Sequence, residues 1–130
     1  MPLTLADLSI LGAVAAYIAP IAIVKYGALG AFDNRKPRDP LFYRDPFRAR
    51  GLWAHQNGME GFAFFAVAVV VAQMRGAPQH IADGLALGYV ALRFAYDAAY
   101  LANLAKLRSA VWALALAVNV ALLLSPLLHR

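Results

Sequence analysis

The sequence predicts an all-α integral membrane protein: a four-helix, up-down-up-down bundle that forms a single transmembrane domain, residues 1–130. Hydrophobic residues make up 62% of the chain and charged residues 15%, and the mean hydropathy is +0.60. A soluble domain of this length has too little interior to bury so much apolar surface. The chain also contains four apolar stretches of about 20 residues or more, each long enough to cross a hydrocarbon core of about 30 Å as a helix.

The four helices are expected at about 3–30, 49–74, 80–105 and 108–128. The first segment lacks the basic start of a signal peptide and is too long for one, so we expect it to be a retained span. The connection at about 31–48 contains Pro37, Pro40 and Pro46 among charged residues, which predicts a non-helical loop. The second connection, around Arg75–Pro78, is a tight turn, and the third is shorter still. Short connections force neighbouring helices to run antiparallel.

The distribution of cations predicts the orientation in the membrane. In and beside the first connection lie Lys25, Arg35, Lys36, Arg38, Arg44, Arg48 and Arg50. The third connection, on the same side, adds Lys106 and Arg108, whereas the other side has Arg75 and Arg130. By the positive-inside rule the basic loop is cytoplasmic and both termini lie outside. The net charge of +5 is therefore a matter of topology and of contact with anionic membrane lipid, and we expect no nucleic-acid partner.

The absence of cysteine excludes disulfides, cysteine-based metal sites and a thiol nucleophile in the protein. Three scattered histidines have no metal-ligand spacing, so no metal site is expected. The chemistry must therefore come from other polar residues.

Ionisable residues inside two of the apolar segments are the strongest functional signal. A charge in hydrocarbon costs about 2.5–3.5 kcal/mol on insertion scales, so such residues are usually paired and functional. Glu60 and Arg93 each lie about 12 residues, or about 18 Å, from the cytoplasmic end of their helix. Matching depth on neighbouring helices allows an ion pair between them, within one chain or across a subunit boundary.

Each of these residues belongs to a polar helix face. The two faces are Arg50, Trp53, Asn57 and Glu60 on the second helix, and Arg93, Tyr96, Tyr100 and Asn103 on the third. Because both faces open toward the basic side, they predict a cavity suited to an anionic or zwitterionic polar molecule.

A purely structural interpretation stays open at this point. Buried ion pairs fix the register of helices, and Asp97, four residues after Arg93, is placed to neutralise it within the helix. Trp53 and Trp112 are typical of membrane-interface anchors. Gly84 and Gly88 form a small-xxx-small pair, which indicates helix packing.

The second-helix run Arg50-Gly-Leu-Trp-Ala-His-Gln-Asn57-Gly-Met-Glu60-Gly-Phe-Ala-Phe-Phe65 resembles a signature of the MAPEG family, the membrane-associated proteins in eicosanoid and glutathione metabolism. The third-helix run Arg93-Phe-Ala-Tyr96-Asp-Ala-Ala-Tyr100, with Leu107-Arg108-Ser109-Ala-Val-Trp112 after it, is similar to that family's other signature. The resemblance covers nearly the whole chain and is to a bacterial-type member. It implies a homotrimer in the bacterial inner membrane, with sites between neighbouring subunits near the cytoplasmic side.

For function, the resemblance implies a glutathione-dependent transferase or peroxidase that acts on an apolar small molecule from the bilayer. Glutathione would be a co-substrate, its polar ends held by Asn57 and Glu60. The same pocket would be lined by Arg93, Tyr96 and Tyr100, with Arg50 on the same helix face as Asn57. Arg108 would stabilise the glutathione thiolate, helped by Ser109, and these two are the catalytic candidates.

Two departures from the family pattern keep other functions open. Trp53 stands where glutathione-using members often have an arginine that binds a carboxylate, and Ala63 stands where a proline is usual. One alternative is therefore a non-catalytic binding or regulatory protein on the same scaffold. The other is a small transporter with Glu60 as its intramembrane carboxylate.

Overall fold

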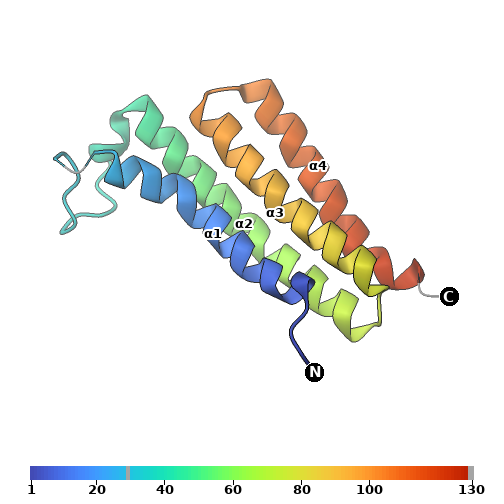
Figure 1. Cartoon of the computed structure of the whole chain (residues 1–130). Helices are drawn as coiled ribbons and strands as arrows, with labels where there is room; N and C mark the ends of the chain where they lie inside the picture. Colours follow the sequence, from blue (N-terminus) through green and yellow to red (C-terminus); the bar gives the residue numbers. More distant parts are fainter. Residues whose placement is uncertain (29, 129–130) are drawn as a thin grey trace.

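The computed structural model describes residues 1–28 and 30–128, and these form an antiparallel four-helix bundle. The α-helices are α1 (Leu5–Tyr26), α2 (Pro46–Met74), α3 (Gln79–Leu101) and α4 (Ala105–Leu124), with two 3₁₀ turns, η1 (Phe42–Arg44) and η2 (Ser125–Leu128). Figure 1 shows the α1–α2 loop and the α3–α4 connection at one end of the bundle. The N-terminus, the 3₁₀ turn η2 after α4 and the α2–α3 turn lie at the other end (Figure 1). The predicted all-α, up-down-up-down fold is confirmed.

The helix ends follow local capping chemistry. Thr4 and Asp7 form a capping box that begins α1. Asp45 caps α2 by accepting a hydrogen bond from the Arg48 N–H, and Pro46 occupies the first helical position. Helix α3 ends at Leu101, and two residues later Asn103 has a φ of 59°, a left-handed conformation that stops the helix.

These caps move several boundaries from the positions expected from the sequence. Helix α1 ends at Tyr26 rather than at about residue 30, and α2 begins at Pro46 rather than at about residue 49. Helix α3 ends at Leu101 rather than at about residue 105, and α4 begins at Ala105 rather than at about residue 108. Position 29 and Arg130, which entered the predicted first helix and the charge count, lie outside the described residues.

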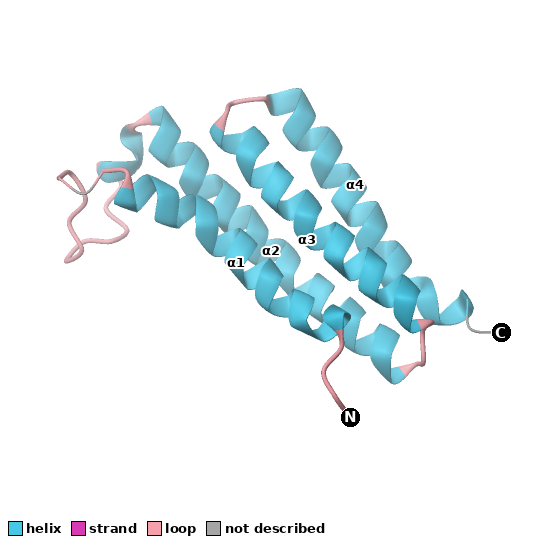
Figure 2. Cartoon of the chain, in the orientation of Figure 1, coloured by secondary structure: helices cyan, strands magenta, loops and turns pink. Residues whose placement is uncertain are grey.

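The basic connection, expected to be non-helical, contains the 3₁₀ turn η1, and Figure 2 shows most of the rest as loop. It also contains an aromatic cluster. The Phe42 ring packs edge-on against Phe32 and Tyr43, with centroids 5.2 Å and 4.9 Å away. The Arg48 guanidinium lies 4.5 Å from the centroid of the same ring. The Tyr43 hydroxyl donates to the Pro37 carbonyl at 3.0 Å, and partial burial raises the pKa of its phenol. The three prolines thus direct an ordered loop rather than an open one.

Glycines on α2 allow α1 to approach closely. A Cβ on Gly58 would lie 2.5 Å from Tyr17 Cβ, and one on Gly51 would lie 2.3 Å from Val24 Cγ1. Gly51 is therefore required by the packing. The His55 ring, one turn from Gly58, bonds through Nδ1 to the Tyr17 carbonyl at 2.6 Å. The α1–α2 pair is a tightly seated unit on which the rest of the bundle packs.

The apolar core lies toward the terminal end of the bundle. It contains small residues of all four helices around Phe65, Val69 and Leu122, each completely buried. Tyr89 joins this core by stacking on Phe65 with ring centroids 4.2 Å apart. Among the described helices, α1, α2 and the segment Ala105–Leu128 are long and apolar enough to span a membrane. Helix α3, which carries Asp83, Arg93 and Asp97, is not among these spans, although it lies alongside α4 in the bundle.

Candidate functional site

A hydrogen bond between α2 and α3 marks the centre of the candidate site. The Arg93 Nη2 group donates to Asn57 Oδ1 at 2.9 Å, and Arg93 is only 5% exposed. Gly58, next to Asn57, also lies beside this guanidinium, because a Cβ there would be 3.7 Å from Arg93 Nη2, an ordinary contact distance. The buried guanidinium is thus fixed by a neutral amide, and among the described residues no carboxylate lies within 4.0 Å of it.

Two arginines flank two tyrosines in a row of side chains that runs from Arg93 to the start of α4. The Arg93 guanidinium lies 4.2 Å from the centroid of the Tyr96 ring, and Arg108 lies 4.5 Å from that of Tyr100. The two tyrosine rings meet edge-on at 5.6 Å. Cations over aromatic faces are stabilised by the ring quadrupole, so this cation–aromatic ladder holds both guanidinium groups in defined places.

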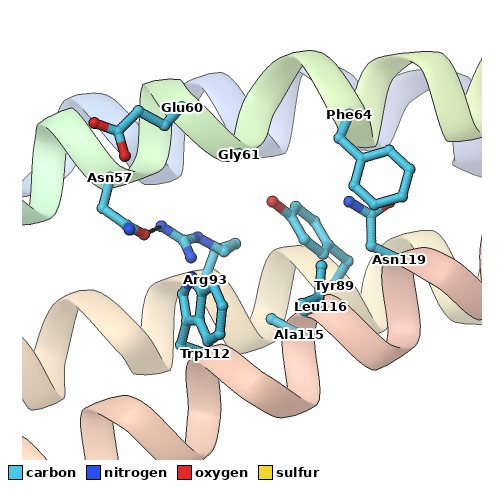
Figure 3. A pocket seen from close by; sticks show the side chains of 10 residues that line it. All are labelled: Asn57, Glu60, Gly61, Phe64, Tyr89, Arg93, Trp112, Ala115, Leu116 and Asn119. Carbon is cyan, nitrogen blue, oxygen red and sulfur yellow. Dashed lines mark hydrogen bonds between the residues drawn. The ribbon is translucent and has the colours of Figure 1, made fainter.

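Two adjoining cavities open along this ladder, each of about 200 Å³. The outer cavity is lined by Asn57, Tyr96, Arg108, Ser109 and Trp112. The inner cavity lies farther from the basic loop and is lined by Asn57, Glu60, Gly61, Phe64, Tyr89, Arg93, Trp112, Ala115, Leu116 and Asn119 (Figure 3). Because Asn57 and Trp112 line both, the two cavities are parts of one site between α2, α3 and α4.

Glu60 and Arg93 do not form within one chain the ion pair that their matching depths allowed. Glu60 is exposed, and among the described residues the ion pair within 4.0 Å is that of Arg35 with Asp33. Figure 3 shows the Glu60 carboxylate above Asn57, while the Arg93 guanidinium reaches Asn57 itself. Glu60 is three residues beyond Asn57 and so points about 60° away around the helix. The carboxylate is consequently at the rim of the inner cavity, where an incoming cationic group can reach it.

Asp97 forms no ion pair with Arg93 within 4.0 Å either. Its side chain is 5% exposed, and its Oδ2 has no hydrogen-bond partner among the described residues. The structural-clasp interpretation of Glu60, Arg93 and Asp97 therefore has no direct contact to support it within one chain.

The remaining predicted site residue, Arg50, lies apart from both cavities. Its Nε donates to the Leu101 carbonyl at 3.3 Å, and its guanidinium lies 5.9 Å from the Phe47 ring centroid. A cation at a helix C-terminus is favourable, so Arg50 ties the end of α3 to the start of α2. The residue spacing correctly predicted that Arg50 and Asn57 share one face of α2. Arg50, however, lies nearer the start of the helix and does not line the cavities.

Sequence reasoning missed three residues of the inner cavity. Trp112 was interpreted as an interface anchor, yet it lines both cavities. Tyr89 lies one helical turn before Arg93 on the same stripe of α3, and that spacing was the available signal. Asn119, seven residues after Trp112, is a single amide within an apolar segment of α4.

Two other predictions concern sites elsewhere in the bundle. A Cβ added at Gly84 or Gly88 would meet nothing within 4 Å, so these glycines do not pack helices within the chain. They face the outside of the bundle, and the glycines at close helix contacts are Gly51 and Gly58 of α2 and Gly12 of α1, where a Cβ would lie 3.0 Å from Val90 Cγ1. Within the described residues, no group of three or more histidine, aspartate or glutamate side chains is arranged to hold a metal ion.

The fold and this site define an integral membrane four-helix bundle with a polar cavity between α2, α3 and α4 that contains two arginines. Residues 4–128 match the MAPEG family, and the chain belongs to that family. No curated protein and no solved structure gives a significant match.

Proposed function

We propose that this protein is a membrane-embedded glutathione-dependent transferase or peroxidase that acts on apolar molecules drawn from the bilayer. The observation that carries the proposal is the convergence of Asn57, Arg93, Tyr96, Arg108 and Ser109 on two joined cavities. The MAPEG family has glutathione-related transferase and peroxidase members, which is consistent with this chemistry. The proposal assigns the cavities to glutathione as co-substrate.

The polar groups of the site complement those of glutathione. The tripeptide carries two carboxylates, one ammonium group and one thiol. Arg93, which has no ion-pair partner within 4.0 Å, and the amide of Asn57 suit a carboxylate, and the exposed Glu60 at the rim suits the ammonium group. Arg108, held over Tyr100 beside the outer cavity, would receive the sulfur.

In the transferase reaction Arg108 acts by favouring the thiolate, because the thiolate and not the thiol is the nucleophile. The thiol proton passes to solvent. The sulfur then attacks the electrophilic carbon of the second substrate, a carbon–sulfur bond forms, and the leaving group departs with its electron pair. Ser109 offers a hydroxyl donor beside the same cavity. No protein atom is covalently modified.

Access for an apolar substrate is provided by α4. Trp112 and Leu116 line the site, and each is more than 40% exposed on the surface of the isolated bundle. A ligand in the hydrocarbon region would therefore meet the cavity across an apolar face. We further propose a homotrimer in a bacterial inner membrane, with the basic loop cytoplasmic, both termini outside, and each open site completed by a neighbouring subunit.

A non-catalytic binding protein is the second candidate, and Trp53 favours it. Trp53 is 51% exposed and lines neither cavity, so it does not replace the arginine that glutathione-using members often have there. Glutathione binding without turnover would identify this second function.

The test is thermal unfolding of the detergent-purified protein over a range of glutathione concentrations, together with conjugation of glutathione to an apolar aryl halide. A saturable rise in the melting temperature accompanied by turnover supports the transferase. A rise without turnover supports the binding protein. No rise at millimolar glutathione would remove glutathione as the ligand.

A further inference from the structure

The inner cavity extends past the residues that the proposed glutathione chemistry uses, toward the apolar core. Its outer part holds Asn57, Glu60 and Arg93, whereas its deep part is lined by Phe64, Tyr89, Ala115, Leu116 and Asn119 (Figure 3). On α4 the lining runs from Trp112 to Asn119, which is about 10 Å along the helix axis. The deep part is therefore the mostly apolar end of the inner cavity, and we call it the deep compartment.

Asn119 is an unsatisfied polar group in this compartment. It is 3% exposed, and its Oδ1 has no hydrogen-bond partner in the part of the chain that the structure describes. A buried amide without partners is costly, so a group retained in this state needs an explanation.

Tyr89 offers a second polar group from the opposite wall. The residue is 4% exposed, and its ring is fixed by stacking on Phe65. Figure 3 shows its hydroxyl pointing across the cavity toward Gly61, with Arg93 on one side and Asn119 on the other. Gly61 leaves the space for this hydroxyl, because a Cβ there would lie 3.3 Å from the Tyr89 oxygen. Bulk at position 61 would close the compartment.

We propose that Asn119 and Tyr89 form a subsite for the hydroxyl group of an otherwise apolar ligand. A hydroxyl group both donates and accepts, and so matches an amide and a phenol together, whereas an ether only accepts. The amide of Asn119 can turn by 180° and exchange its oxygen for its nitrogen, so it can present the acceptor to this group. Phe64, Ala115 and Leu116 surround the adjoining carbon chain.

This inference rests on the proposed function in one respect: it makes the occupant the second substrate. The subsite would then select hydroxylated aliphatic molecules and hold them with the polar group deep and the reacting part toward Arg108. The binding itself requires no glutathione, so it can be tested separately.

Trp112 provides the reporter for that test. The chain has two tryptophans, and Trp53 lines neither cavity, so Trp53→Phe leaves Trp112 as the single emitting indole. This variant, reconstituted in lipid nanodiscs without glutathione, is titrated with a long-chain primary alcohol and with its methyl ether. We expect a saturable change in Trp112 emission, with the alcohol bound about five- to tenfold more tightly than the ether.

Asn119→Leu in the Trp53→Phe background removes the amide at similar volume. We expect it to abolish the preference for the alcohol, to reduce alcohol affinity about fivefold, and to leave the melting temperature unchanged or higher. Tyr89→Phe, which keeps the stacked ring, should give a smaller loss of preference. Equal affinity for alcohol and ether would overturn the proposal. It would indicate instead that an ordered water forms the hydrogen bond to the Asn119 amide. A preference that survives in Asn119→Leu would also overturn it.

Failure of this test is distinguishable from failure of the proposed function. Loss of the alcohol preference with an intact response to glutathione would refute the subsite alone. Alcohol binding that depends on Asn119 in a protein that ignores glutathione would keep the subsite and refute the transferase.

Discussion

The two ends of the bundle both carry polar side chains between helices, but they use them differently. At the terminal end, Asp83 accepts hydrogen bonds at 2.8 Å from the Ala6 N–H and from Gln79 Nε2. Gln73 donates to both members of the α1 capping box, Thr4 and Asp7. This terminal network joins α1, α2 and α3 with its donors and acceptors matched, and it contains no arginine or lysine.

At the basic-loop end the polar groups are not matched in this way. Arg93 has an amide partner and an aromatic face, Arg108 has an aromatic face, and Asp97 Oδ2 has no partner among the described residues. A fully satisfied network stabilises a structure, whereas cations held in place without a directly bonded carboxylate favour an anion from outside. The comparison teaches that polarity within the membrane region is structural at one end and available for ligands at the other.

The largest predicted effect is a loss of turnover when a residue at the basic-loop end is changed. Arg108→Ala removes the group assigned to thiolate stabilisation, so glutathione conjugation should fall by about 10²- to 10³-fold, as when one electrostatic donor is removed from an active site. The melting temperature and oligomeric state should change little, because Arg108 packs on Tyr100 at the bundle end. Arg108→Lys is the matched control and should restore part of the rate. Retained turnover in Arg108→Ala would remove this residue from the mechanism.

The second prediction concerns the terminal network and is measured as stability. Asp83→Ala deprives the Ala6 N–H of its acceptor, so we expect a loss of about 1–3 kcal/mol in unfolding free energy with conjugation per folded molecule unchanged. Asp83→Asn keeps an acceptor oxygen in the same place and should lose less. A change in turnover that exceeds the change in folded fraction would show that the two ends are coupled.

The third prediction tests Glu60 at the rim of the inner cavity. Because its carboxylate is exposed and forms no ion pair with Arg93, Glu60→Gln should change the stability of the ligand-free protein by less than about 0.5 kcal/mol. The glutathione-dependent rise in melting temperature should be lost. A loss of several kcal/mol in the ligand-free protein would instead reveal a structural pair made with a neighbouring subunit.

The smallest predicted effect is at the outward-facing glycines. Gly84→Ala meets no atom within 4 Å and replaces a flexible residue in a helix, so it should stabilise the monomer by about 0.5–1 kcal/mol or be neutral. Gly58→Ala is the contrast, because its Cβ would lie 2.5 Å from Tyr17 Cβ, and it should destabilise by about 1–3 kcal/mol. Both are read by thermal unfolding in detergent. A Gly84→Ala variant that loses its oligomeric state would show that another subunit covers this face.

The fold was largely predictable because apolar length and short connections specify the number and direction of membrane helices. The spacing of Arg93, Tyr96 and Tyr100 also placed these residues correctly on one face of α3. The choice between Asn57 and Glu60 as the partner of Arg93 was not predictable, because equal depth does not fix the rotation of α2. That rotation depends on how Gly51 and Gly58 seat against α1, which is a tertiary property.

The inner cavity was harder still to predict. Tyr89 and Asn119 are isolated among apolar neighbours in the sequence. The sequence around a single buried amide or phenol is the same whether its hydrogen bonds are satisfied or not. Its significance depends on partners that only packing reveals, as with the unpartnered Asn119 Oδ1.

The marginal apolarity of α3 has a consequence for how the protein is made. Helix α3 is not among the segments apolar enough to span a membrane on their own, and Arg93 lies within it. During biosynthesis this segment would leave the insertion machinery favourably only once α2 is beside it, with Asn57 ready to bind the guanidinium. The tight turn at Gly76, where φ is +70°, keeps the two segments adjacent from the moment both have emerged. We therefore expect helices α2 and α3 to enter the bilayer as one hairpin, so that the contact between Asn57 and Arg93 at the candidate site would also permit integration.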